Sequence, residues 1–140
     1  METKCKDRVQ DALDSRMEDI KVLWENYQAG IEDAEIGNFN EYGLCFDYVG
    51  KYSVGIGYPN PGYFRYQISW GGPSEEFRFM TMNPDALDPE IDFWLLDWFD
   101  GAKVTLTGEY REVMLEIWEF FKEIGSTQHE YEKWEGDFID

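Results

Sequence analysis

The sequence holds a single histidine, His129, among its 140 residues. A Ser-His-Asp or Cys-His catalytic arrangement would have to use this residue, because both place an imidazole beside the nucleophile. His129 lies in a polar C-terminal stretch next to Glu130, and the sequence contains no nucleophile-elbow motif. We therefore expect His129 to be an exposed side chain and the protein not to be an enzyme.

Cysteines and long apolar runs are equally scarce. The two cysteines, Cys5 and Cys45, are too few for a disulfide framework or a cysteine-rich zinc site. The first residues are charged rather than apolar, and no apolar run approaches the roughly 20 residues that a membrane helix needs. These features favour a cytoplasmic protein with no cofactor, no metal and no membrane partner.

Basic residues are few in relation to acidic ones. The chain has 12 Lys and Arg against 30 Asp and Glu, a formal net charge of -18. Such a charge repels phosphate, so nucleic acids and anionic membranes are not expected partners, whereas a basic protein is. Aromatic residues, in contrast, make up 18% of the chain, enough to build a packed core. The length fits one domain over residues 1–140.

Two amphipathic helices are predicted near the ends of the chain. Apolar residues recur every three or four positions over about 6–28, and Gly30 is suited to end that helix. A polar connection over 31–42 follows. The same periodicity predicts a helix over about 109–124. The last fifteen residues are polar with spaced aromatic side chains, and they either dock on the domain or stay partly mobile.

The clearest supersecondary signal is a β-hairpin. Residues 63–69 and 75–81 alternate between apolar and polar side chains on either side of a glycine-bearing turn at 70–74. One face of the hairpin would carry the apolar residues Phe64, Tyr66, Ile68, Phe77 and Phe79. The opposite face would carry Arg65, Gln67, Glu76 and Arg78.

Further strands are expected around this hairpin. They are placed at 43–49, at 91–99 before a turn at Asp100 and Gly101, and, as an optional short strand within the loop 50–62, at Tyr52–Ile56. The order of elements predicts an α+β fold in which an antiparallel sheet of three to five strands lies between an N-terminal and a C-terminal amphipathic helix.

Motifs for phosphate, metal or acid–base chemistry are weak. Gly71-Gly72 is followed by Pro73, which removes a backbone N–H, so a hairpin turn is favoured over a phosphate loop. The acidic stretch with Asp85, Asp88, Glu90 and Asp92 lacks the EF-hand spacing, so we expect a solvated loop rather than a cation site. No spacing selects a catalytic pair among Asp47, Glu76 and Asp97.

Arg65 and Arg78 stand out because bases are scarce and both fall on one face of the hairpin. The favoured interpretation is that they pair with Glu76 and neighbouring carboxylates across the strands. The alternative is a partner-binding or small-molecule site.

The acidic residues themselves form the most informative pattern. In the predicted C-terminal helix, glutamates spaced 3, 4, 3 and 4 residues apart fall within a stripe of about 80°, with one charge per roughly 5 Å of axis. This stripe consists of Glu109, Glu112, Glu116, Glu119 and Glu123. The N-terminal helix has a second stripe in the same register, formed by Asp7, Asp11, Asp14 and Glu18. Either the stripes are solvated helix faces, or they imitate a nucleic-acid backbone, which carries a charge every 3.4 Å per strand.

Two resemblances bear on function. The stretch Gly62–Phe79, with Phe93–Ala102, resembles a hairpin signature of small proteins from phages and other mobile elements. In size and charge the chain also resembles acidic anti-CRISPR and anti-restriction proteins, which commonly occupy a DNA site on a host defence enzyme. The second resemblance implies a non-enzymatic inhibitor in the bacterial host cytoplasm, whose partner would be a CRISPR effector or another nucleic-acid-binding defence enzyme. The alternative is an immunity or antitoxin protein that neutralises a basic toxin such as a nuclease.

Overall fold

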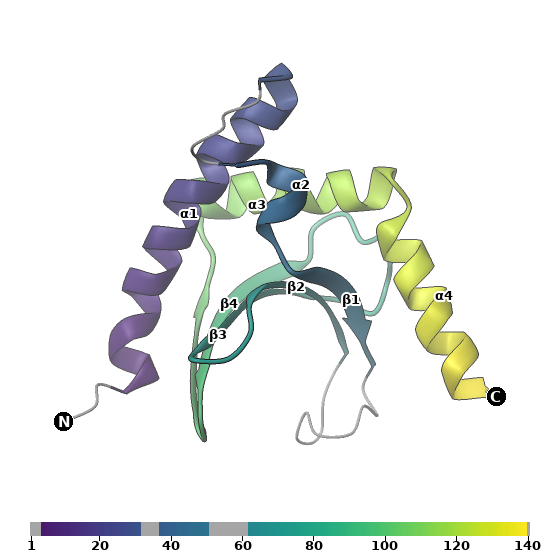
Figure 1. Cartoon of the computed structure of the whole chain (residues 1–140). Coiled ribbons are helices and arrows are strands. Elements are labelled where there is room, and N and C mark those ends of the chain that lie inside the picture. Colours follow the sequence, from purple (N-terminus) through teal and green to yellow (C-terminus); the bar gives the residue numbers. More distant parts are fainter. Residues whose placement is uncertain (1–3, 32–36, 51–61, 140) are drawn as a thin grey trace.

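Over the residues that the structure describes, the protein has an α+β fold with four helices and a five-stranded antiparallel sheet. The computed structural model describes residues 4–31, 37–50 and 62–139 (Figure 1). The elements in chain order are α1 (Cys5–Ala29), α2 (Phe39–Tyr42), β1 (Cys45–Val49), β2 (Tyr63–Ser69), β3 (Ser74–Met80), β4 (Glu90–Asp97), β5 (Asp100–Thr105), α3 (Gly108–Glu123) and α4 (Ser126–Ile139). The optional strand Tyr52–Ile56 lies outside the described residues.

The sheet is a simple meander in which each strand pairs with the next in the chain, in the order β1-β2-β3-β4-β5. The predicted hairpin is confirmed as β2 and β3, with Phe64 opposite Phe79 and Tyr66 opposite Phe77. Arg65 lies opposite Arg78 on the other face. The alternating pattern therefore predicted both the hairpin and the two faces of its strands correctly.

The core lies between the helices and the apolar face of the sheet. Figure 1 shows α1 beside one lateral edge of the sheet, α4 beside the other edge, and α3 running between them. The indole of Trp118, on α3, is fully buried and lies 4.9 Å from the ring of Phe79 and 5.4 Å from that of Phe64. Its Nε1–H donates to the carbonyl of Ala86, 2.8 Å away, so the connection between β3 and β4 is fixed to the core as well.

Both predicted amphipathic helices are confirmed as α1 and α3. The α1 helix ends at Gly30, which adopts the left-handed φ of 71° that a residue without a Cβ reaches at no steric cost. The N–H groups of Gly30 and Ile31 then donate to the carbonyls of Tyr27 and Asn26, which closes the end of the helix.

The region after Ile91 differs from its prediction. The strand ends at Asp97, the turn is made by Trp98 and Phe99, and β5 begins at Asp100, which pairs with Asp97. The apolar run 91–99 predicts a strand over its whole length, because hydrophobicity alone does not show where a chain reverses direction. The rings of Trp98 and Phe99 belong to the turn and point into solvent, and Trp98 adopts a left-handed φ of 56°.

Two further segments contain helices that the sequence did not predict. The connection 31–42 contains the short helix α2, whose first turn is capped by the side chain of Asn38 accepting from the Asn40 N–H at 3.0 Å. The last fifteen residues contain α4, which docks on β1. Tyr131 and Trp134 each place their rings 5.2 Å from that of Tyr48. Tyr131 and Trp134 therefore lie on the partly buried side of a helix.

Replacing Trp118 by alanine is expected to lower the free energy of unfolding by about 3–5 kcal/mol, since it opens a cavity among packed rings and leaves the Ala86 carbonyl without its donor. Leu87→Ala is the matched control, because Leu87 is 81% exposed, and should change stability by less than about 0.5 kcal/mol. Urea denaturation followed by circular dichroism measures both. A similar loss in the two variants would contradict the assignment of Trp118 to the core.

Candidate functional site

The glutamate stripe of α3 faces away from the core. The buried side chains of this helix are Met114, Ile117, Trp118 and Phe121. At 100° per residue, their centre lies nearly opposite the centre of the glutamate stripe. Glu109, Glu112, Glu116 and Glu123 are exposed, and Glu119 is half-exposed. The whole predicted stripe therefore lies on the solvent side of the helix.

The acidic stripe of α1 is also exposed. Asp7, Asp11, Asp14 and Glu18 all lie on the solvent side of the helix. The opposite side packs on β4 and β5 with buried residues that include Leu13, Met17 and Ile20.

The two stripes adjoin where α1 and α3 meet. Three side-chain contacts connect the helices at this place. The Tyr110 hydroxyl donates to Asp14 at 3.0 Å, Lys21 forms an ion pair with Glu109, and the Gln28 amide donates to Glu116 at 3.4 Å. The sequence predicted each stripe but not their contact. We name the combined set the α1–α3 acidic surface: Asp7, Asp11, Asp14, Glu18, Glu109, Glu112, Glu116, Glu119 and Glu123.

Little positive charge offsets this surface. Lys21 pairs with Glu109, and the hydrogen bond that it donates to this carboxylate raises the pKa of the Lys21 ammonium group. Lys122 pairs with Glu119 at 3.0 Å. The nine carboxylates and these two ammonium groups give a formal charge of -7, and Glu112 has no ion pair among the residues that the structure describes.

Arg65 and Arg78 lie on the other face of the sheet, and both are paired. Arg65 forms a bidentate pair with Asp47 of β1, with N–O distances of 3.0 and 2.7 Å. Arg78 donates to Glu76 at 2.7 Å, along its own strand. The favoured interpretation, pairing with Glu76 and neighbouring carboxylates across the strands, is confirmed for Arg65, which pairs across strands with Asp47. It is confirmed only in part for Arg78, whose partner is Glu76 but on the same strand.

Aromatic rings complete the surroundings of Arg78. Its guanidinium lies 4.6 Å from the ring centre of Tyr63 and 4.3 Å from that of Trp94, so the cation is held between two π faces. The side chains of Arg78 and Glu76 are 15% and 2% exposed. Neither Arg65 nor Arg78 lines any of three hollows in the described part of the chain. These hollows therefore do not support a small-molecule site beside the two arginines.

The acidic stretch that follows β3 is spread out in space. Asp88 pairs with Arg111 of α3 at 2.5 Å, whereas the buried Asp92 lies within β4 and accepts from Thr105 at 2.7 Å. Asp85 and Glu90 are exposed. Within residues 4–31, 37–50 and 62–139, no group of three or more His, Cys, Asp or Glu side chains is placed to hold a metal ion.

The remaining sequence candidates come from three elements, α1, β1 and α4. His129 is on α4, its side chain is 76% exposed, and its Nε2 is 3.8 Å from the Glu130 carboxylate. Cys5 is buried at the start of α1, Cys45 is exposed on β1, and both thiols are free. None of the helices in the described part of the chain is long and apolar enough to cross a membrane.

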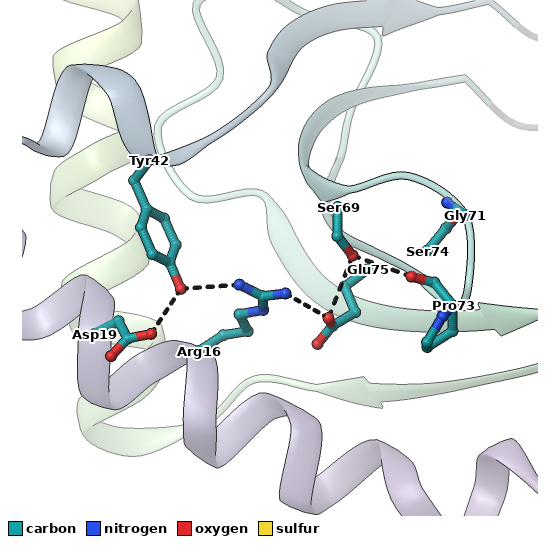
Figure 2. A network of polar contacts seen from close by, with 8 residues as sticks. All are labelled: Arg16, Asp19, Tyr42, Ser69, Gly71, Pro73, Ser74 and Glu75. Atoms are coloured by element: carbon teal, nitrogen blue, oxygen red, sulfur yellow. Dashed lines mark hydrogen bonds and ion pairs between the residues drawn. The ribbon is translucent and has the colours of Figure 1, made fainter. Parts of the chain in front are cut away.

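A partly buried polar network, which the sequence did not reveal, joins α1 to the residues that flank the β2–β3 turn (Figure 2). Arg16 donates to Glu75 at 2.7 Å and to the Tyr42 hydroxyl at 3.2 Å, and Tyr42 in turn donates to Asp19. The hydrogen bond to Glu75 raises the pKa of the Arg16 guanidinium. Ser69, at the end of β2, also donates towards Glu75, at 3.2 Å.

No family model, no curated protein and no solved structure matches this chain.

Replacing Arg16 by methionine is expected to lower the free energy of unfolding by about 2 kcal/mol, because the Glu75 carboxylate, with a side chain 12% exposed, loses its cation. Lys21→Met removes a more exposed pair, since the side chains of Lys21 and Glu109 are 32% and 66% exposed, and should cost less than about 1 kcal/mol. Unfolding in urea, which leaves ion pairs unscreened, measures both. Equal losses would show that the Arg16 network adds nothing beyond a surface pair.

Proposed function

We propose that the α1–α3 acidic surface binds the positively charged nucleic-acid groove of another protein, and that the chain is a non-enzymatic inhibitor acting as a nucleic-acid mimic. The observation that carries this proposal is the junction of the two stripes. The contacts Asp14–Tyr110 and Lys21–Glu109 bring carboxylates from two helices into one surface of formal charge -7.

The spacing of the charges supports this function. Carboxylates three or four residues apart on a helix are separated by about 4.5–6 Å along the axis. A DNA strand carries one phosphate per 3.4 Å, so the surface offers a comparable though sparser line of negative charge. The net charge of -18 adds a long-range field that speeds encounter with a basic partner.

The fixed position of α1 also supports a binding role. Arg8 pairs with Asp97 at 2.8 Å and Arg16 with Glu75 at 2.7 Å, so two of the bases of α1 are held against the sheet. The carboxylates on the solvent side of α1 are therefore presented from a rigid helix, and little entropy is lost when a partner binds.

The target class follows from the resemblance in size and charge to anti-CRISPR and anti-restriction proteins. A CRISPR effector or a restriction enzyme has a basic groove that accepts a duplex, and carboxylates in place of phosphates would block it. The alternative is an immunity or antitoxin protein for a basic toxin such as a nuclease, since the same surface would fit that partner too.

The target is to be identified by capture on the immobilised chain from bacterial lysates that contain CRISPR effectors and restriction enzymes, followed by competition with duplex DNA. We expect the captured protein to bind either the chain or DNA, but not both. A captured nuclease toxin encoded beside the chain would favour the alternative. A partner that binds chain and DNA together would contradict mimicry.

Charge reversal at Glu112, Glu116 and Glu119 together is expected to weaken binding to that partner at least about 100-fold, because three attractions become repulsions. The control triple variant reverses three exposed acids elsewhere, Asp85, Glu90 and Glu135, and so has the same net charge. Calorimetric titration measures both variants. Equal loss in the two would show that bulk charge, rather than this surface, determines binding.

Binding is also expected to weaken steeply as salt is raised from about 0.1 M to about 1 M, where the screening length falls from roughly 10 Å to 3 Å. The slope of log Kd against log salt concentration should be smaller for the surface triple variant than for the control triple. A salt-independent Kd would contradict an electrostatic interface.

A further inference from the structure

Three large aromatic side chains are exposed together at one end of the sheet. In a meander of antiparallel strands, the β2–β3 and β4–β5 turns lie at the same end. The first turn carries Trp70, which is 73% exposed, and the second carries Trp98 and Phe99, which are 90% and fully exposed. A hollow of about 350 Å³ lies between the two turns, with Trp70, Leu96 and Trp98 in its lining. We name Trp70, Trp98 and Phe99 the hairpin-tip patch.

Both turns are held firmly by α1. Asp97 pairs with Arg8 at 2.8 Å, and the Asp100 carboxylate accepts from the Cys5 N–H at 2.7 Å. This backbone hydrogen bond lowers the pKa of Asp100. The pair of Arg16 and Glu75 fixes the start of β3, directly after the other turn (Figure 2). The exposed rings therefore stand on an ordered frame, which is how residues that contribute most to an interface are usually displayed.

The charges around the hairpin-tip patch balance, unlike those of the molecule as a whole. The start of α1 and the β4–β5 turn hold three bases and three acids: Lys4, Lys6, Arg8, Asp7, Asp97 and Asp100. Two copies of a protein of net charge -18 repel each other over most of their surfaces. At this end the repulsion is smallest, and bases of one copy can lie near acids of the other.

We propose that the hairpin-tip patch is the interface of a homodimer. A two-fold axis brings the same surface of both copies together, so each copy must offer both a projecting group and a recess. The patch offers both: the exposed ring of Phe99, and a hollow whose lining includes Trp70, Leu96 and the adjacent Trp98. Rings of each copy enter the hollow of the other. An exposed group of aromatic residues rimmed by paired charges is typical of such contact sites.

The charge balance favours a second copy over other occupants. A basic partner would gain more at the α1–α3 acidic surface, since the hairpin-tip patch offers no net negative charge. An anionic membrane would be repelled by the molecule as a whole. The proposal is independent of the proposed function, and a dimer would present two acidic surfaces.

The test is the mass of the full chain in solution, measured by light scattering and sedimentation equilibrium up to about 1 mM, the concentration at which even weak pairing is seen. We expect the mass to rise from 16.6 kDa to twice that value. The dimer should tighten from about 0.1 M to about 1 M salt, because salt screens the repulsion between copies. Binding of a basic partner has the opposite salt dependence, so failure of one proposal is distinguishable from failure of the other.

The double variant W98S/F99S and the single variant W70S are expected to weaken dimerisation at least about thirtyfold, as for residues that dominate an interface. Leu87→Ser is the matched control, since Leu87 is 81% exposed in the β3–β4 connection, at the opposite end of the sheet. Circular dichroism checks that each variant is folded.

A monomer of 16.6 kDa at about 1 mM and about 1 M salt would overturn the proposal, as would a dimer that W98S/F99S and W70S leave unchanged. A monomer whose tryptophan emission shifts to the blue on phosphatidylcholine vesicles would overturn it in favour of a lipid surface.

Discussion

The attachment of α1 to the sheet through its arginines determines where the charge of this protein lies. Arg8 and Arg16 turn inward to Asp97 and Glu75, and Lys21 turns sideways to Glu109. Arginines of the sheet are engaged in the same way, as the bidentate pair of Arg65 with Asp47 shows. These four bases thus connect different elements, while the surplus carboxylates remain on the solvent side. As a result, surplus negative charge collects on the solvent side of two helices, where it forms the α1–α3 acidic surface.

Much of the fold could be predicted from side-chain periodicity. The alternation in residues 63–81 predicted the hairpin and both of its faces, because one side of each strand is buried among rings and the other is polar. The turn at Trp98 and Phe99 could not be predicted in this way. Hydrophobicity normally indicates burial, and these rings are exposed, so the pattern indicated a strand where the chain reverses. The helix α4 could not be predicted for a related reason, since the polar residues between Tyr131 and Trp134, whose rings contact β1, hide the periodicity.

The candidate site was predictable in its parts but not as a whole. A spacing of three and four residues places Glu112 and Glu116 on one side of a helix whatever the helix packs against. The angle and contact between two helices are tertiary properties. Side chains of Tyr110 and Gln28 connect the stripes, and neither has a sequence pattern that points to its partner. The balanced charges at the hairpin tips depend in the same way on α1 starting beside the β4–β5 turn.

The open meander has a consequence for aggregation. Its edge strands are β1 and β5, and a free strand edge can template pairing with other chains. At one edge, α4 packs on β1 through the rings around Tyr48. At the other, β5 spans only six residues and carries Asp100 and Lys103, and charges on a short strand discourage further strands from adding. The sheet is therefore protected against fibre growth at its two sides by different means: a docked helix at one and charged side chains at the other.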